Sequence, residues 1–265
     1  MTPPNNYRPA VLGVSTSLRE ARERRDIGLR PLARQIGISP SRLHALEQGV
    51  NLPHEPDVAR VLGFLRISGA EYDRIIKLAR HVDDVNYLEE HASEAVGLTR
   101  IYEQLATRIV EWAPHCIPEL LRTQRAGQAC SETRDLEPFE HNVGRQEVQD
   151  GIHQYLFLIG ENALSTAKTG PGAVEQICRV RTVASLPHVT VRIVPTAGHD
   201  PGNAFTIFEV DRASVAVAIK SVHCTAYLTE KALLDKYSET ADALNRRRLR
   251  KTATALSNSP WELAS

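Results

Sequence analysis

Leu29-Arg-Pro-Leu-Ala-Arg-Gln-Ile-Gly-Ile-Ser-Pro-Ser-Arg-Leu-His-Ala-Leu-Glu-Gln-Gly49 is the stretch that decides the fold of the N-terminal part of the chain. It predicts two short helices separated by a tight turn at Gly37, a residue that readily adopts the positive φ that ends a helix. The second helix has a clear start, because Ser39 is a favoured N-cap residue and Pro40 suits the first helical position. Apolar residues share one face on each helix, which predicts that the two pack together: Leu32, Ala33 and Ile36 on the first, Leu43 and Leu46 on the second.

Helical patterns continue on both sides of this stretch. A first helix opens at Leu18, a fourth at Pro56 and a fifth at Ser68, which places five short helices within about 65 residues. Residues 1–15 carry three prolines and two asparagines and are expected to form a flexible arm. The sequence therefore predicts a compact all-α domain over residues 16–82.

Charge is divided unevenly along the 265 residues, although the chain as a whole is neutral. Residues 1–82 hold 13 Lys and Arg against 8 Asp and Glu, whereas residues 83–265 hold 19 against 24. A basic module joined to an acidic one favours an anionic partner for the first module. The run Arg22-Glu-Arg-Arg25 is expected on the outer, solvated face of the first helix, with a direct contact to DNA as its alternative.

The sequence carries no sign of export or membrane insertion. No apolar run approaches the roughly 18 residues that span a bilayer, and the first residues lack the basic and apolar regions of a signal peptide. The cysteines form no C-x-x-C pair and are expected to be reduced thiols: Cys116, Cys130, Cys178 and Cys224. We therefore expect a cytoplasmic protein with no membrane partner, associated with the nucleoid when bound to DNA.

Residues 83–265 predict a larger α+β domain. Runs rich in β-branched and aromatic residues predict strands at Arg108–Trp112, Tyr155–Ile159, Val189–Val194, Phe205–Val210 and Ser214–Ile219. Helical patterns predict helices over Tyr87–Thr99, Gly172–Ala184 and Thr229–Ser257. His199-Asp200-Pro-Gly predicts a turn between two strands. The fold class is thus multi-domain, with a five-helix domain followed by a larger α+β domain.

Signals of catalysis are missing from the sequence. There is no P-loop, no G-x-S-x-G and no G-x-G-x-x-G, and Glu161, at the end of a predicted strand, is expected to be solvated or ion-paired. Several histidines and cysteines could meet in space, but no two of them have a short ligand spacing: Cys178, His188, His199, His223 and Cys224. The sequence predicts no catalytic residue, no metal and no cofactor. An enzyme with a vestigial DNA-binding module is a further alternative, which would need a co-purifying cofactor or metal.

The stretch from Leu29 to Gly49 resembles the helix-turn-helix of the Cro/lambda-repressor-type, or xenobiotic-response-element, family. Leu18-Arg-Glu-Ala-Arg before it and Leu52-Pro-His-Glu-Pro56 after it are also similar to that family. The resemblance implies that the helix from Pro40 enters the major groove of double-stranded DNA.

The predicted DNA-contacting residues follow from that docking mode: Arg30, Ser39, Pro40, Ser41, Arg42 and His44. Arg42 can donate two hydrogen bonds to guanine O6 and N7, and its alternative is a contact to phosphate alone. Arg30, Ser39 and Ser41 are expected at phosphates, where cations, hydroxyls and helix N-termini position a protein. His44 is the other exposed candidate on the reading helix, with an ordinary surface histidine as its alternative.

The second domain resembles the antitoxin-like domain that follows the helix-turn-helix in actinobacterial, WhiJ-like regulators. The landmarks of that resemblance are Ile117–Thr123, Glu161–Leu164, Leu186–Pro195, Pro201–Phe205 and Tyr227-Leu228. Together the two resemblances cover about residues 15–263. The second one implies a short companion protein encoded nearby, in the manner of a toxin–antitoxin pair.

These patterns together predict a sequence-specific DNA-binding transcriptional regulator that acts as a homodimer. Its C-terminal domain is expected to sense a partner protein or a small-molecule effector, and to mediate dimerisation. The alternative is an antitoxin-like interaction protein that chiefly binds a small companion protein and autoregulates its own operon.

Overall fold

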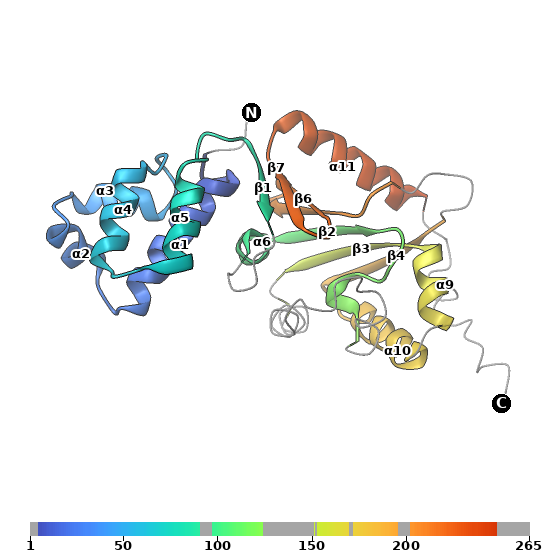
Figure 1. Ribbon diagram of the computed structural model, residues 1–265. Helices are drawn as coiled ribbons and strands as arrows, with labels where there is room; N and C mark the ends of the chain where they lie inside the picture. The colour runs from blue at the N-terminus through green and yellow to red at the C-terminus, as the bar shows by residue number, and fades with distance from the viewer. Residues whose placement is uncertain are drawn as a thin grey trace. The chain divides into compact units, whose positions relative to one another are not determined.

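The computed structural model describes residues 5–90, 97–123, 151, 153–169, 172–195 and 202–247 (Figure 1). The chain forms two compact units, one of residues 1–104 with 225–234 and the other of residues 105–224 with 235–265. Cys130 lies outside the described residues, and so does the predicted turn at His199–Gly202 apart from Gly202. No helix within the described ranges has the length and apolar character needed to cross a bilayer.

Five α-helices follow a short 3-10 helix in the first unit, which confirms the predicted all-α N-terminal region. Their bounds are η1 Asn5–Tyr7, α1 Pro9–Arg24, α2 Leu29–Gln35, α3 Pro40–Glu47, α4 Glu55–Phe64 and α5 Gly69–Ala79. The inward face of each helix carries the apolar residues that its sequence pattern predicted, and Leu32, Leu43, Leu62 and Ile75 are fully buried.

The expectation of a flexible arm over residues 1–15 is wrong for residues 5–15, because α1 begins at Pro9. Proline suits the first helical position, where no backbone N–H is needed. Val11 and Val14 are fully buried and continue the helical spacing of Leu18 and Ala21. Burial of this face holds the segment in the helix, and Pro9, one of the prolines that suggested an arm, instead marks where the helix starts.

The turn between α2 and α3 is built on Gly37, as predicted. Gly37 has φ +70°. The Gly37 N–H donates to the Arg34 carbonyl (3.4 Å) and the Ile38 N–H to the Ala33 carbonyl (3.0 Å), which satisfies carbonyls left open at the helix end. Asp26 and Arg66 have positive φ after α1 and α4, so a non-glycine residue takes this conformation at two other helix ends.

The first unit extends beyond its five helices. It also contains β1 (Asn86–Glu90), α6 (Leu98–Leu105) and β7 (Cys224–Leu228), apart from one residue at an end of α6 and of β7. The helix predicted over Tyr87–Thr99 is therefore wrong at residues 87–90, which lie in β1, while residues 91–96 of that range lie outside the described residues; β7 was not predicted. Alternate residues of β1 are exposed, the two-residue period of a strand.

Helix α6 packs closely on α1. A Cβ at Gly13 would lie 2.9 Å from both the Leu78 and the Leu98 side chains, so glycine is needed where α1 meets α5 and α6. Tyr102 of α6 donates a hydrogen bond of 2.7 Å to the Tyr7 carbonyl. The start of the chain and α6 therefore share one core.

A partly buried carboxylate joins β1, α6 and β7. Glu89 accepts hydrogen bonds from the Leu98 N–H (3.0 Å) and the Tyr227 hydroxyl (3.1 Å). The Tyr227 hydroxyl also lies 2.6 Å from the Thr99 hydroxyl, and its ring stacks on that of Tyr102. Burial raises the pKa of both tyrosines, so both stay neutral.

The sheet of the second unit has the strand order β6-β5-β2-β3-β4. Strands β2, β3 and β4 are parallel, whereas β5 is antiparallel to both β2 and β6. Their bounds are β2 Arg108–Ala113, β3 Gln154–Gly160, β4 Val189–Val194, β5 Phe205–Val210 and β6 Ala213–Lys220. All five strands predicted from the sequence are confirmed.

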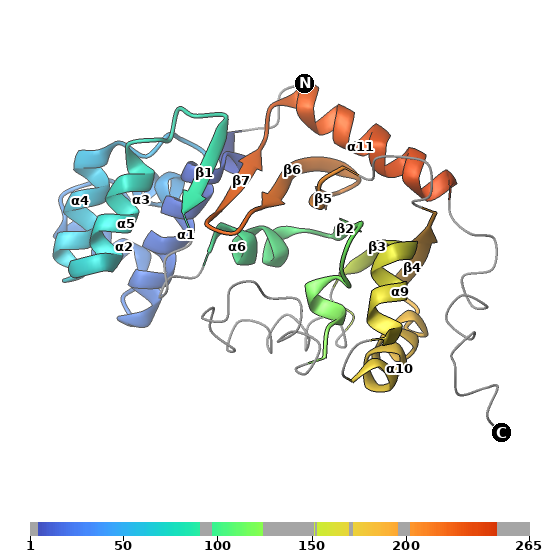
Figure 2. The same ribbon diagram turned by 45° about the vertical axis from the view of Figure 1, so that its right-hand side comes forward.

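Helices cover both faces of this sheet (Figures 1 and 2). Helix α11 (Lys231–Arg246) lies over one face, while α9 (Glu161–Thr169) and α10 (Ala173–Ala184) lie over the other. The rings of Phe205 and Tyr237 meet at 4.9 Å between their centroids, and the Ser214 and Ser238 hydroxyls are 2.9 Å apart. Glu161 begins α9 directly after β3 and is exposed, and α9 itself was not predicted.

Glu111 of β2 is an ionisable group on the face of the sheet opposite α11. Its register partners are Phe157 and Thr206, so it lies among apolar strands rather than in open solvent. Burial, helped by the negative charge of Glu119, raises the pKa of Glu111 to about 7 against the opposing charges of Arg122 and Lys220. Glu111 therefore ionises less readily in the folded protein than in the unfolded chain.

Replacing Gly37 with alanine should lower the free energy of unfolding by about 1 kcal/mol, because an L-residue resists positive φ. Gly63 of α4 is the matched control, since a Cβ at either glycine meets no described atom within 4 Å outside its immediate neighbours, and only Gly37 has positive φ. Gly63→Ala should raise stability by up to about 1 kcal/mol. Denaturant unfolding of the two variants measures this, and equal effects would contradict the proposed turn.

The raised pKa of Glu111 makes stability depend on pH. The native state holds this proton more tightly than the unfolded state, so its contribution is full below about pH 4.5 and is lost as the pH rises through about 7. Glu111→Gln should therefore exceed the wild type in stability at about pH 8, by up to about 3 kcal/mol, and match it near pH 5. Urea melts at both pH values measure the difference; Glu239→Gln, an exposed glutamate of α11, should leave the pH dependence unchanged.

Candidate nucleic-acid interface

Helix α3 divides into a buried face and an exposed one. Leu43 is fully buried and Leu46 is nearly so, and both pack inward against the rest of the first unit. Ser41, Arg42 and His44 are exposed on the other side. All six predicted DNA-contacting residues are exposed in the structure: Arg30, Ser39, Pro40, Ser41, Arg42 and His44.

The N-terminus of α3 is capped as predicted. The Ser39 hydroxyl accepts a hydrogen bond of 3.2 Å from the Arg42 N–H, and Pro40 occupies the first turn. The cap fixes the direction in which α3 starts, and it leaves other N–H groups of the first turn able to meet an anion. Arg30, in the first turn of α2, adds a positive charge to the same motif.

Arg42 is held by a residue that the sequence analysis did not single out. Its Nη2 donates to Oδ2 of Asp57, in the first turn of α4, at 2.6 Å. The Arg42 side chain is 56% exposed, whereas that of Asp57 is 11% exposed. One corner of the guanidinium is therefore anchored while its outer part faces solvent.

A second arginine–carboxylate pair lies inside the unit. Arg22 donates from Nε and Nη2 to the two Glu47 oxygens at 2.7 and 2.8 Å, a bidentate pair. Its Nη1 donates to the Ile27 carbonyl, and hydrogen bonding to Glu47 raises the Arg22 pKa. The Glu47 side chain is only 2% exposed.

This pair corrects one expectation and limits the surface that α3 can offer to DNA. Arg22 was expected on a solvated outer face, but its side chain is 13% exposed because it reaches the end of α3. Glu47, the last residue of the helix expected to contact DNA, points into the unit and is not available to a base. The exposed part of the helix is therefore its N-terminal half, together with His44.

The sequence contained partial signals of both pairs. A glutamate at the end of α3 and an arginine late in α1 have opposite charge, but only the crossing of the two helices makes them neighbours. Asp57 follows a proline in the first turn of α4, where an acidic side chain favours the helix N-terminus. Because this local role is enough to explain Asp57, the sequence offered no separate indication of its contact with Arg42, 15 residues earlier.

The described part of the second unit shows no comparable clustering of reactive groups. No set of three histidine, cysteine or acidic side chains lies close enough to hold a metal ion in the described ranges. Cys116, Cys178 and Cys224 form no disulfide with one another or with another described residue. His199, one of the histidines considered above, lies outside the residues described.

Comparison with known proteins identifies both parts of the chain. Residues 15–75 match the model of a helix-turn-helix domain, and residues 98–256 match that of a domain of unknown function, DUF5753. The chain belongs to the DUF5753 family. Its helix-turn-helix domain marks this DUF5753 protein as a DNA-binding regulator.

Similarity to individual proteins is low. No curated protein matches the chain. Among solved structures, TrmBL2, an archaeal chromatin protein whose structure shows a novel mode of DNA binding, is 10% identical. The match covers 80% of this chain and 72% of that one, with a TM-score of 0.35.

The DUF5753 match begins at Leu98, the first residue of α6. Because Leu98 contacts Gly13 of α1, the first helix of the family domain packs within the first compact unit. The start of the family domain and the boundary between the two compact units therefore fall at different residues.

Glu47→Ala should lower the free energy of unfolding of the first unit by about 3–5 kcal/mol, because it removes the buried bidentate partner of Arg22 and leaves that largely buried charge with only the exposed Glu23 as a carboxylate partner. Glu23→Ala, which removes an exposed partner of the same arginine, should cost less than about 1 kcal/mol. Denaturant melts of the full chain measure both. A similar cost for the two variants would mean that the buried pair does not organise this unit.

Proposed function

We propose that this protein is a sequence-specific transcription regulator that reads base edges in the major groove with the N-terminal half of α3. One observation carries the proposal: α3 is capped by Ser39 and buries Leu43 and Leu46, while Ser41, Arg42 and His44 face solvent. That arrangement is the one in which the second helix of a helix-turn-helix presents its first residues to DNA.

Arg42 is the base-reading residue in this proposal. A guanidinium can donate two hydrogen bonds to guanine O6 and N7, and the exposed part of Arg42 retains donors besides the one given to Asp57. Asp57 acts as a positioning residue, because anchoring one nitrogen limits the orientations of a long side chain before it meets DNA. Arg30, Ser39 and Ser41 contact phosphates, and His44 flanks the base-reading position.

The second unit regulates DNA binding in this proposal. It senses a small-molecule effector or a partner protein, and it supplies the contact of a homodimer. One reading helix with few base contacts gains affinity when two-fold symmetry presents a second copy to a half-site about one helical turn away. The protein acts in the cytoplasm on the nucleoid, and its output is control of transcription rather than catalysis.

Arg42→Ala should weaken binding to a specific duplex by about 1–3 kcal/mol, or about 5–150-fold in Kd. The duplex is first selected by the full chain from a random pool, and gel-shift titrations then compare it with a scrambled duplex at one salt concentration. Arg60→Ala, which removes an exposed arginine of α4, is the matched control and should weaken both duplexes equally and slightly.

The comparison separates base reading from charge. A loss confined to the selected duplex identifies Arg42 as a base-reading residue, whereas an equal loss on both duplexes makes it a phosphate contact. Asp57→Asn should weaken only the selected duplex, and by less than Arg42→Ala, because it frees the guanidinium without removing it. A wild-type chain that selects no sequence from the pool would refute sequence-specific regulation.

A further inference from the structure

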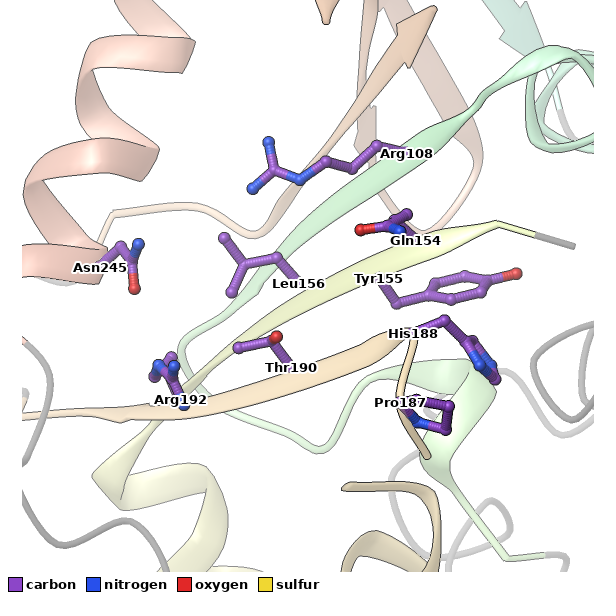
Figure 3. A pocket seen from close by; sticks show the side chains of 9 residues that line it. All are labelled: Arg108, Gln154, Tyr155, Leu156, Pro187, His188, Thr190, Arg192 and Asn245. Atoms are coloured by element: carbon purple, nitrogen blue, oxygen red, sulfur yellow. The ribbon is translucent and has the colours of Figure 1, made fainter. Parts of the chain in front are cut away.

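A polar cavity of about 280 Å³ lies in the second unit (Figure 3). Strands β2, β3 and β4 form its floor, and Asn245 of α11 contributes to its wall. Its volume is close to the lower end of the roughly 300–1,000 Å³ typical of small-molecule sites. The cavity is therefore large enough for a metabolite-sized ligand and too large to be filled by a single inorganic ion.

The strand register brings the polar side chains together. Arg108 of β2 pairs with Gln154 of β3, and Leu156 of β3 pairs with Thr190 of β4. Arg192 follows Thr190 by two residues on the same strand, so both face the same side of the sheet. Figure 3 shows the side chains of Arg108, Leu156, Thr190 and Arg192 toward α11, with the rings of Tyr155 and His188 directed away.

This polar corner interrupts an otherwise apolar layer. On the same face, Val110, Leu158, Ile207 and Val217 are almost completely buried. Arg108, Thr190 and Arg192, on the two strands that flank β3, make no contribution to such an apolar core. Their presence calls for a polar occupant.

The two arginines differ in their partners. Arg108 donates from Nη1 to Glu209 at 2.8 Å, so its charge is balanced within the protein. Among the described residues, Arg192 makes one hydrogen bond, a long one of 3.4 Å from Nη1 to the carbonyl of the preceding residue. The Nε of Arg192 is buried and has no hydrogen-bond partner in the described part of the chain.

A partly buried guanidinium without a carboxylate is costly unless an anion meets it. We propose that this cavity binds a small organic anion whose phosphate or carboxylate group accepts hydrogen bonds from Arg192, with its polar body against Thr190, Gln154 and Asn245. Nε and an Nη of one guanidinium face a phosphate or a carboxylate as a pair of parallel donors. The Thr190 hydroxyl is a further donor beside them.

This inference rests on the proposed function in one respect, because the bound anion is the effector of the regulatory unit. Binding of the anion itself requires no DNA. It can therefore be measured on the full chain alone.

Isothermal titration calorimetry of the full chain with glycerol phosphate and with malonate, at constant ionic strength, tests the site. At least one probe should bind saturably, and the stronger of the two identifies the anionic group that the cavity prefers. Arg192→Gln should weaken that binding about 10-fold or more, since it removes a charge-assisted contact. Lys236→Gln removes an equal charge from an exposed position of α11 outside the cavity and should change affinity less than about twofold.

A second variant guards against a folding defect in Arg192→Gln. Thr190→Val keeps the charge and shape of the cavity but removes the hydroxyl, and it should weaken the probe about threefold or more while circular dichroism stays unchanged. No saturable binding by the wild type, or equal weakening by Arg192→Gln and Lys236→Gln, would overturn the inference. A chain that binds its selected duplex but neither probe fails this inference alone, whereas one that binds a probe but selects no duplex fails the proposed function alone.

Discussion

The buried pair of Arg22 and Glu47 is the constraint on which the DNA-reading part of the molecule depends. Two charges removed from water are tolerated only when each satisfies the other with good geometry, and the bidentate contact at 2.7 and 2.8 Å does so. Arg22 also donates to the Ile27 carbonyl, so the same side chain holds the turn after α1. The end of α3 is thereby tied to the end of α1.

Fixing that end of α3 determines which of its residues can meet DNA. Leu43 and Leu46 must then face the core, and the Ser39 cap sets the opposite end. Ser41, Arg42 and His44 are what remains on the outside. Specific recognition needs base-contacting groups held within a narrow range of positions. Here the hydrophobic core, the cap and the buried pair restrict the orientation of α3, and the Asp57 contact restricts the side chain of Arg42.

The second unit shows a different use of arginine. Its five strands are apolar where α11 covers most of them, and polar at one corner, where Arg108 and Arg192 lie on β2 and β4, to either side of β3. Arg108 is neutralised by Glu209, whereas Arg192 has no carboxylate among the described residues. Arg108 is thus paired with a carboxylate of the protein itself, whereas we infer that the partner of Arg192 is a bound anion.

The sequence by itself determined the elements whose signals are local. The helices α2 and α3, the Gly37 turn, the Ser39 cap and the five strands of the second unit follow from periodicity, capping and β-branched runs, each within a few residues. The exposed residues of α3 also followed, because burying Leu43 and Leu46 leaves only the other face. The two family resemblances were likewise visible in short motifs.

Only the tertiary structure decided the features that join distant residues. The Arg22–Glu47 pair spans 25 positions, the Arg42–Asp57 contact 15, and the hydrogen bond between Tyr227 and Glu89 spans 138. Burial of Val11 and Val14 turned an expected arm into the start of α1, and pairing in a strand replaced the helix expected at Tyr87. The cavity beside Arg192 depends on the register of three strands. Local propensity is a property of neighbouring residues, whereas burial, charge pairing and strand register arise only when the chain brings separate segments together.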